Sequence, residues 1–297
     1  MCLSLIFIIS LLSLLLLLVA VAFFTLMERK VLGYLILRKG PNKPSFSGLW
    51  VPFADALKLI TKLSIFPLAS RPKVIVYSCL LLFLIPSSLW SHLKLPSQIN
   101  SFTHTMVCLL VLISFSIFGL LMAGWASNSK YSVLGSTRCV AQSISYECCL
   151  SLGFLTIALF KTLDFLTVTP DFNLLLMIHV CGIVYVVLLA ESNRSPFDFA
   201  EGESELVSGY NVEYSGSFFV LLFLSEYLSL LFLSFVSGAL FTDGTYFLTL
   251  LSCLALSFLF IWVRGTLPRL RYDQLIQLCW KSLLPCVTFS YLLYLVI

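Results

Sequence analysis

Long apolar runs, separated by short polar stretches, make up most of the chain. A transmembrane helix needs roughly 20 predominantly apolar residues, and runs of that order recur from one end to the other. The predicted spans cover about 3–27, 73–91, 103–125, 137–160, 173–190, 216–240, 245–264 and 282–297. The predicted fold class is therefore all-α: a polytopic membrane protein with about eight transmembrane helices, forming a single integral-membrane domain over residues 1–297.

The first apolar run is interpreted as a retained helix rather than a signal peptide. It is too long for the hydrophobic region of a signal peptide and has no basic segment before it. It also ends in Glu28-Arg29-Lys30 instead of small residues that mark a cleavage site.

The polar loop at 28–72 contains one further predicted helix, which lies in the membrane surface. Ser47 is the expected N-cap of this helix. Apolar residues recur behind it at helical spacing, at Trp50, Phe53, Ala54, Leu57 and Ile60. The opposite face carries Asp55, Lys58 and Lys62. One apolar and one charged face are typical of an interfacial amphipathic helix, and the segment is too charged to cross the bilayer.

Composition excludes a soluble protein and several kinds of site. Charged residues make up 11% of the chain and the mean hydropathy is +1.02, whereas roughly 25% of residues are charged in soluble domains. The ten cysteines form no C-x-x-C pair and most lie in apolar runs, where they act as small hydrophobic side chains. We expect no metal site, no iron–sulfur cluster and no disulfide in this chain. No nucleotide, flavin or hydrolase motif is present.

Basic residues indicate the orientation in the membrane. All of them except Lys94 and Lys161 fall in or beside four loops, at about 28–72, 126–136, 191–215 and 265–281. By the positive-inside rule these loops face the cytoplasm or the matrix. An even number of spans then places both termini on the opposite side. The net charge of +4 is interpreted as a topology signal and not as a sign of nucleic-acid binding.

Acidic residues gather in one stretch on this inner side, AESNRSPFDFAEGESELVSGYNVEY, residues 190–214. The stretch holds six of the 14 acidic residues of the chain: Glu191, Asp198, Glu201, Glu203, Glu205 and Glu213. Ser195 as an N-cap and Pro196 at the first helical position predict a short helix over 196–207. Carboxylates this close to a membrane need arginine partners or raised pKa values.

Four acids lie within or at the ends of the spans. Glu147 and Glu226 are each about ten residues inside a span, Glu191 closes one, and Glu213 opens one. An ionisable group at bilayer depth costs at least about 2.5 kcal/mol, so such groups face a protein interior or a wet cavity. Each acid taken alone is compatible with a neutral, hydrogen-bonded carboxyl or with pairing to Arg138 or Lys130. Four acids next to an acidic loop favour a chain of protonatable groups.

Five segments resemble one known family. They are LMERKVLGYLILRKGPNK (26–43), PFADALKLITK (52–62), GWASNSKYSVLGSTRCVAQSISYE (124–147), the acidic stretch, and PRLRYDQLIQLCWK (268–281). They occur in family order over nearly the whole chain. The sequence is similar to chain 1 of the proton-pumping NADH:ubiquinone oxidoreductases, respiratory complex I, in the mitochondrial form. A departure at Lys43-Pro44-Ser45, where relatives are more apolar, does not touch the acids.

The resemblance implies a role in a large assembly. A family member is a core membrane subunit that anchors the hydrophilic arm and forms much of the tunnel through which ubiquinone enters. It is part of an H⁺-translocating NADH:ubiquinone reductase but holds no complete active site and no catalytic residue of its own. Implied partners are the other membrane-arm and hydrophilic-arm subunits, ubiquinone and phospholipid, with no nucleic acid. The chain would bind no cofactor, since FMN and iron–sulfur clusters belong to partner subunits. The implied location is the mitochondrial inner membrane, with both termini on the intermembrane-space side.

The resemblance also implies roles for individual residues. The quinone tunnel would be lined by Glu28, Arg29, Arg38, Phe53, Asp55, Arg194, Asp198, Glu201 and Phe223. A proton path would use Glu147, Glu191, Glu203, Glu205, Glu213 and Glu226. Contact with the hydrophilic arm, or neutralisation of the acids, would fall to Arg269, Arg271 and Asp273.

Two other functions are compatible with the residues alone. Acids between membrane helices also suit a stand-alone proton-coupled transporter, although no inverted repeat is visible. A purely structural membrane anchor would not need the acids.

Overall fold

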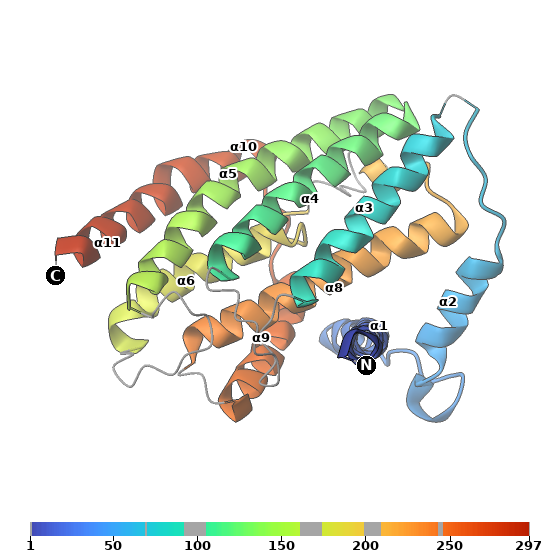
Figure 1. The fold of residues 1–297 in the computed structure, drawn as a ribbon, viewed down its shortest axis with the longest axis horizontal. Helices are drawn as coiled ribbons and strands as arrows, with labels where there is room; N and C mark the ends of the chain where they lie inside the picture. Colours follow the sequence, from blue (N-terminus) through green and yellow to red (C-terminus); the bar gives the residue numbers. More distant parts are fainter. Residues whose placement is uncertain are drawn as a thin grey trace.

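The computed structural model describes residues 2–68, 70–91, 105–160, 174–198, 209–242 and 246–296. Within these ranges every regular element is a helix, as Figure 1 shows. The longer helices are α1 (Cys2–Leu35), α3 (Pro72–Ser91), α4 (Thr105–Ser127), α5 (Lys130–Phe160), α6 (Leu174–Glu191), α8 (Gly216–Phe241) and α9 (Tyr246–Thr266). The shorter elements are η1 (Phe46–Gly48), α2 (Val51–Thr61) and η2 (Gly209–Asn211), and the C-terminal run of α10 (Tyr272–Gln277), η3 (Leu278–Leu283) and α11 (Leu284–Val296).

Seven helices in the described part of the chain are long and apolar enough to cross a membrane. They fall in α1, α3, α4, α5, α8, α9 and the C-terminal run from Tyr272 to Leu292. A shorter apolar helix covers His179–Glu191, at the end of α6. The prediction of an all-α, polytopic membrane protein is therefore confirmed, with a span count close to the expected eight.

Several helices extend beyond the apolar runs that predicted them. α1 continues to Leu35 and therefore contains Glu28, which was expected in a loop. α5 begins at Lys130 instead of 137, and the last helix begins at Tyr272 instead of 282. The reason is that polar residues continue these helices where other helices bury them: Glu28 is only 5% exposed. Hydropathy locates the segment that crosses the membrane, and it does not locate the ends of a helix.

The surface helix α2 is present but starts later than predicted. Ser47 is not its N-cap, because Ser47 has a φ of 54° inside the turn η1, a backbone conformation that does not start a right-handed helix. The following Gly48 has a φ of 74°, which only glycine adopts without strain. α2 begins at Val51, and Pro52 lies in its first turn, where its missing N–H has no helical acceptor.

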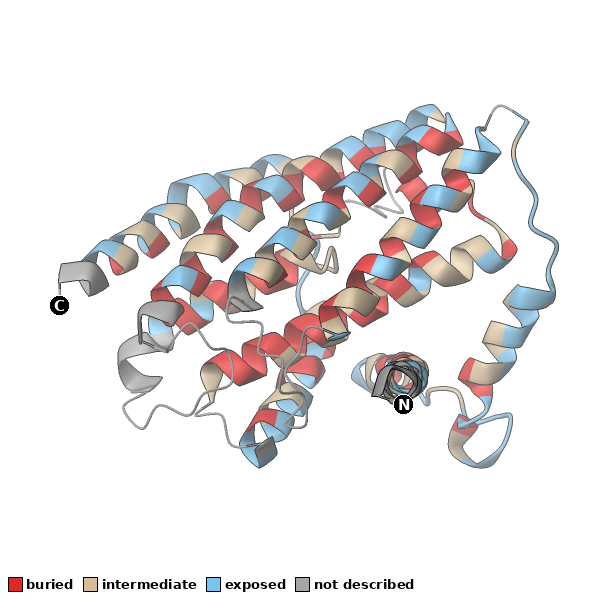
Figure 2. Cartoon of the chain, in the orientation of Figure 1, coloured by how far each residue is buried: buried red, intermediate tan, exposed pale blue. Residues whose placement is uncertain are grey.

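The helices form one bundle with α8 near its centre. α3, α4 and α5 pack side by side, α6 and α11 pack on α5, and α8 packs on α3 and α9 (Figure 1). α1 contacts α8, α9 and α2. Buried residues line the faces where these helices meet, as the red segments in Figure 2 show. The largest cluster of buried side chains includes Phe154, Leu188 and Phe232, from α5, α6 and α8.

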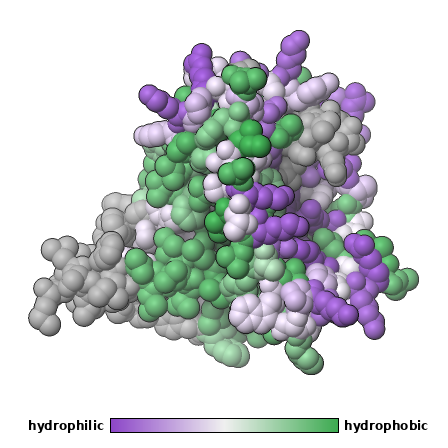
Figure 3. Space-filling view, turned by 90° about the vertical axis from the view of Figure 1, so that its right-hand side faces the viewer, coloured by the Kyte–Doolittle hydropathy of each residue, from purple (hydrophilic) through white to green (hydrophobic). Residues whose placement is uncertain are grey.

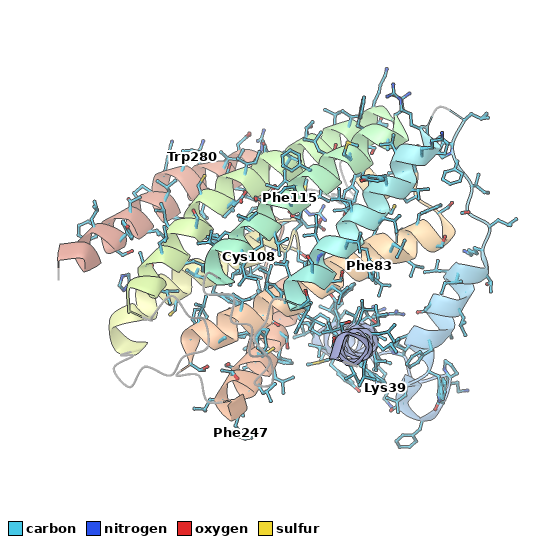
Figure 4. The ribbon with its side chains drawn as sticks, viewed as in Figure 1. Lys39, Phe83, Cys108, Phe115, Phe247 and Trp280 are labelled. Atoms are coloured by element: carbon cyan, nitrogen blue, oxygen red, sulfur yellow. The ribbon has the colours of Figure 1, made fainter. Side chains whose placement is uncertain are left out.

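The outer faces of the bundle are largely apolar. Phe115 in α4, Phe247 in α9 and Trp280 in η3 are between 53% and 76% exposed, and Figure 4 shows them on helices at the outside of the bundle. In the side view of Figure 3, hydrophobic side chains fill a broad region, and hydrophilic ones gather at the top and along one side. Such a surface fits a protein whose helices face hydrocarbon.

Candidate functional site

A cavity of about 90 Å³ lies inside the bundle where α3, α4, α5 and α8 meet the end of α6. Part of its wall is apolar and includes Leu82, Leu89 and Ile113. Pro86 of α3 also lines it, and because proline has no N–H, the carbonyl of Leu82 lacks its usual helical donor. By this measure a single water needs roughly 10–15 Å³, so the cavity has room for several.

The rest of the cavity wall is polar and includes two of the acids that the sequence singled out. Glu191, Arg194 and Glu226 all line it, together with Asn193 and Tyr210. Glu191 and Asn193 each have a buried side-chain oxygen with no hydrogen-bond partner among the described residues. Unpaired acceptors beside an open space are suited to water or to a proton carrier. Residues from the end of one helix and from the middle of another thus meet at a single hollow.

Glu226 is held in this cavity by neutral groups. Tyr210 of η2 donates a hydrogen bond to its Oε1, and the side chain of Asn211 bonds it too. Among the described residues Glu226 forms no ion pair with an arginine, although Arg194 and Asp198 are close enough for their charges to act on it. Glu147 lies outside the cavity lining, yet its charge reaches Glu191. Glu147 and Glu191 therefore interact electrostatically, and Glu226 shares the cavity wall with Glu191. Within the part of the chain that the structure describes, none of the three acids is held in a salt bridge.

A second, charged cluster lies beside this cavity and joins four segments of the chain. The carboxylate of Glu28 in α1 pairs with Arg194 at 3.2 Å and with Arg264 at the end of α9. Tyr227 of α8 donates to the other oxygen of Glu28, at 2.5 Å. The side chain of Glu28 is only 7% exposed and that of Arg194 only 13%. Glu28, Arg194, Tyr227 and Arg264 are called the Glu28 cluster below.

Arg194 belongs to both sites. Its guanidinium lies over the ring of Tyr227, 4.3 Å from the centroid, and donates to the hydroxyl at 3.3 Å, while the residue also lines the cavity. Burial alone would lower the pKa of Arg194, but Tyr227 and the carboxylates of Glu28 and Glu226 raise it above its ordinary value. The side chain is therefore a fixed positive charge between two buried carboxylates.

The segment that presents Arg194 is a turn and not the beginning of a helix. Residues 195–198 form turns and irregular backbone, so the predicted helix does not start at Pro196. The N–H of Phe197 bonds the carbonyl of Arg194 at 2.8 Å, and Leu270 N–H bonds the carbonyl of Pro196 at 3.1 Å. The long-range contact competes with helix formation here. Glu201, Glu203 and Glu205, and the rest of the predicted helix, lie outside the described residues.

The acid of this turn is neutralised by the loop after α9. Arg269 pairs with Asp198 at 3.1 Å. Two roles were expected for Arg269, contact with the hydrophilic arm or neutralisation of the acids, and the choice between them stays a prediction. The place of Asp198 in a quinone tunnel stays a prediction. Arg271 and Asp273 form an exposed ion pair at 3.3 Å, and their contact with another subunit stays a prediction.

The remaining tunnel candidates lie where α1 meets α2. Arg29 pairs with Asp55 at 2.8 Å, with both side chains nearly half exposed. The ring of Phe53 meets Phe23 of α1 edge to face, with 6.0 Å between centroids. Arg38 is exposed beyond the end of α1.

Two further candidates sit apart from these contacts. Phe223 of α8 packs on the ring of Tyr227 with 4.6 Å between centroids, and so it borders the Glu28 cluster. Glu213 is half-buried in the turn before α8 and is not part of the cavity wall. Its place in a proton path stays a prediction.

Three functional candidates were not singled out from the sequence: Tyr210, Tyr227 and Arg264. Arg264 was counted only as a basic loop residue, although it ends an apolar run on the same side as Glu28. A tyrosine directly after a membrane acid, as in Glu226-Tyr227, was a usable signal. Nothing in the local sequence marks Tyr210. Among the described residues no three His, Cys, Asp or Glu side chains are grouped in a way that would hold a metal ion.

Comparisons with known proteins identify relatives over nearly the full length. The family model described as NADH dehydrogenase matches residues 8–295. The chain is 45% identical over 294 residues to the NADH-ubiquinone oxidoreductase chain 1 of Anopheles gambiae, covering 97% of this chain and 93% of that protein. It is 42% identical to the protein of the same name from Thymallus arcticus, covering 90% and 87%, and 40% identical to that from Lampetra fluviatilis, covering 93% and 90%.

Proposed function

The chain belongs to the NADH dehydrogenase family, and we propose that it is a core membrane subunit of the mitochondrial NADH:ubiquinone oxidoreductase, complex I. It sits in the inner membrane as a multi-pass protein, with the basic loops in the matrix and both termini on the intermembrane-space side. It contributes part of the tunnel by which ubiquinone enters and an acidic path that couples quinone reduction to proton translocation. The redox centres, FMN and iron–sulfur clusters, belong to partner subunits.

One observation carries this proposal: Arg194 belongs to the Glu28 cluster and also lines the cavity that holds Glu191 and Glu226. At about 4 Å and an effective dielectric constant of 20, two unit charges interact by roughly 4 kcal/mol. A change of charge on a quinone near the Glu28 cluster therefore alters how strongly Arg194 stabilises negative charge at Glu226. Glu226 then takes up or releases a proton, and this proton transfer is the event coupled to quinone reduction.

The tunnel assignment is supported by the placement of polar side chains between apolar helices. Glu28 and Arg29 are adjacent residues of α1. Arg29 pairs with Asp55 of α2, whereas Glu28 contacts Tyr227 of α8 and Arg264 of α9. Phe223 borders the Glu28 cluster through Tyr227, and Phe53 of α2 packs against Phe23 of α1. Aromatic side chains suit contact with a quinone ring or its isoprenoid tail.

The test begins with the assembly that contains this polypeptide. On a native gel it should migrate within a very large complex, and that complex should show NADH:quinone activity that is sensitive to quinone-site inhibitors. Migration alone or as a small oligomer would instead support a transporter. Within the active complex, Glu147→Gln is expected to lower proton-coupled turnover while the amount of assembled enzyme is retained. Unchanged pumping would remove Glu147 from the path.

A further inference from the structure

A buried glutamine on α5 holds both ends of the turn that carries Glu191 and Arg194. Gln142 is fully buried. Its Nε2 donates one hydrogen bond to the carbonyl of Ala190, at 2.9 Å, and another to the carbonyl of Phe197, at 3.0 Å. A primary amide has two N–H donors, and here both are used on backbone carbonyls that are seven residues apart.

The two acceptors mark the ends of the functional segment. Ala190 is the residue before Glu191 and Phe197 is the residue before Asp198, so the segment between the two hydrogen bonds includes Glu191 and Arg194. Ala190 and Phe197 are 0% and 4% exposed, so no water replaces a lost donor at low cost. Gln142 therefore binds both ends of this segment and holds them together.

The same face of α5 supports the turn one helical turn further on. The ring of Tyr146 packs against Phe197 with 5.9 Å between centroids, and its hydroxyl donates to the carbonyl of Leu275 at 3.1 Å. Residues four apart lie on one helix face, so Gln142 and Tyr146 act together against this turn. On its other side the turn is held by the loop after α9, through the bond from Leu270 to Pro196.

Few other side chains can replace Gln142 at this position. Nε2 donates to both carbonyls, and the carbonyl of Ala190 also accepts from the N–H of Asn193 at 3.2 Å. A flipped amide would place Oε1 against two carbonyl oxygens, and this repulsion fixes the orientation of the amide. Oε1 itself has no partner among the described residues. Leucine supplies no donor. An ionised carboxylate supplies none either and faces two carbonyl oxygens, whereas a protonated carboxyl supplies one. Glutamine is the uncharged side chain of this length that serves both acceptors.

We propose that Gln142 is a positioning residue of the coupling site: its two hydrogen bonds fix the turn over 191–197 and thereby set where Glu191 and Arg194 stand relative to the cavity. This inference rests on the proposed function of those two residues. Gln142 itself touches no substrate and carries no proton. Loss of its two hydrogen bonds lowers activity by displacing the charged side chains of Glu191 and Arg194.

The experiment uses the assembled enzyme with Gln142→Glu and Gln142→Leu, and measures quinone reductase activity relative to wild type at each pH. The carboxyl introduced by Gln142→Glu donates to one carbonyl when protonated and to none when ionised. Its relative turnover is therefore expected to be within about threefold of wild type near pH 6 and to fall roughly tenfold further by about pH 8.5. Gln142→Leu is expected to be low, by about tenfold, at every pH. In both, NADH oxidation by a water-soluble acceptor stays at the wild-type level.

The matched control is Gln277→Glu, the same substitution at an exposed glutamine of α10. Its relative activity is expected to be flat with pH. A flat profile for Gln142→Glu, or wild-type quinone kinetics in assembled Gln142→Leu, overturns the positioning role. If Gln142→Leu fails to assemble, the pH profile of Gln142→Glu alone tests the positioning role. A single preparation of assembled enzyme is assayed at all pH values, so assembly does not affect that profile.

Failure of this inference is distinguishable from failure of the proposed function. If Glu226→Gln alters proton pumping while both Gln142 variants behave as wild type, only the positioning role is wrong. If the Gln142 variants behave as expected and Glu226→Gln leaves pumping unchanged, the turn matters for quinone turnover and the acidic path is wrong.

Discussion

Replacing Glu28 by glutamine tests the Glu28 cluster directly. The substitution keeps the size of the side chain and removes the negative charge that Arg194, Arg264 and Tyr227 contact. Two guanidinium groups then lie next to a neutral amide, and at least one of them is buried.

The magnitude follows from the exposure of each partner. Removing one member of a buried ion pair costs about 3–5 kcal/mol, because the other charge is left uncompensated. Arg194, with a side chain 13% exposed, meets that condition. Arg264 is 33% exposed, so solvent screens it and its share is about 1 kcal/mol at most. We therefore expect Glu28→Gln to destabilise this part of the protein by about 4 kcal/mol.

The assay is a double-mutant cycle on the rate of heat inactivation of quinone reductase activity in the purified complex. The cycle compares wild type, Glu28→Gln, Arg194→Gln and the double variant. Because the double variant leaves no uncompensated Arg194 charge, it should be less damaged than the sum of the single variants. The expected coupling is at least about 1.5 kcal/mol, or more than tenfold in rate.

Asp55→Asn serves as the control in the same assay. Asp55 and its partner Arg29 are 48% and 45% exposed, and exposed pairs contribute about 0.2–1 kcal/mol. Its inactivation rate should stay within a few-fold of wild type. Effects of Glu28→Gln and Arg194→Gln that add to within about 0.5 kcal/mol would refute the reasoning, since the two charges would then not interact.

Three further predictions concern the acid, the surface helix and the packing. Tyr210→Phe removes the hydroxyl that donates to the carboxylate of Glu226 and should lower proton-coupled turnover about tenfold; equal turnover would show that this bond is not used. Asp55→Asn should raise the apparent KM for quinone or change inhibitor sensitivity, and identical quinone kinetics would remove it from the tunnel. Gly124→Ala places a methyl group against Ser136 of α5 and should cost about 1–3 kcal/mol, seen as less assembled complex on native gels. Adding Ser136→Gly should restore assembly, and a failure to do so would mean that the clash lies elsewhere.

The sequence was sufficient to predict the fold class and to single out two acids that line the cavity. Apolar runs of spanning length located the membrane helices, since a single segment satisfies all of its backbone groups within hydrocarbon only as a helix. The cost of burying a carboxylate correctly indicated that Glu191 and Glu226 face an interior cavity rather than lipid. Both inferences depend on one-dimensional patterns and on a physical penalty that holds in any fold.

Details that depend on packing were not predictable in the same way. Ser195 and Pro196 have the composition of a helix start, yet the bond from Leu270, which is distant in sequence, holds this segment as a turn. Arg264 becomes a partner of Glu28 only because α1 and α9 pack together. Gln142 lies in a segment with no charge, and the two carbonyls to which it donates are about 50 residues away in the chain. The local sequence does not predict such long-range contacts.

The central claim is that buried carboxylates couple quinone reduction to proton movement, and the ratio of protons translocated to electrons transferred tests it most directly. The measurement compares wild-type complex with Glu226→Gln in sealed vesicles, with NADH oxidation by a water-soluble acceptor as the check on electron input. The account predicts a lower ratio, or a parallel loss of quinone turnover and pumping, in a fully assembled enzyme. A wild-type ratio at wild-type turnover would contradict it.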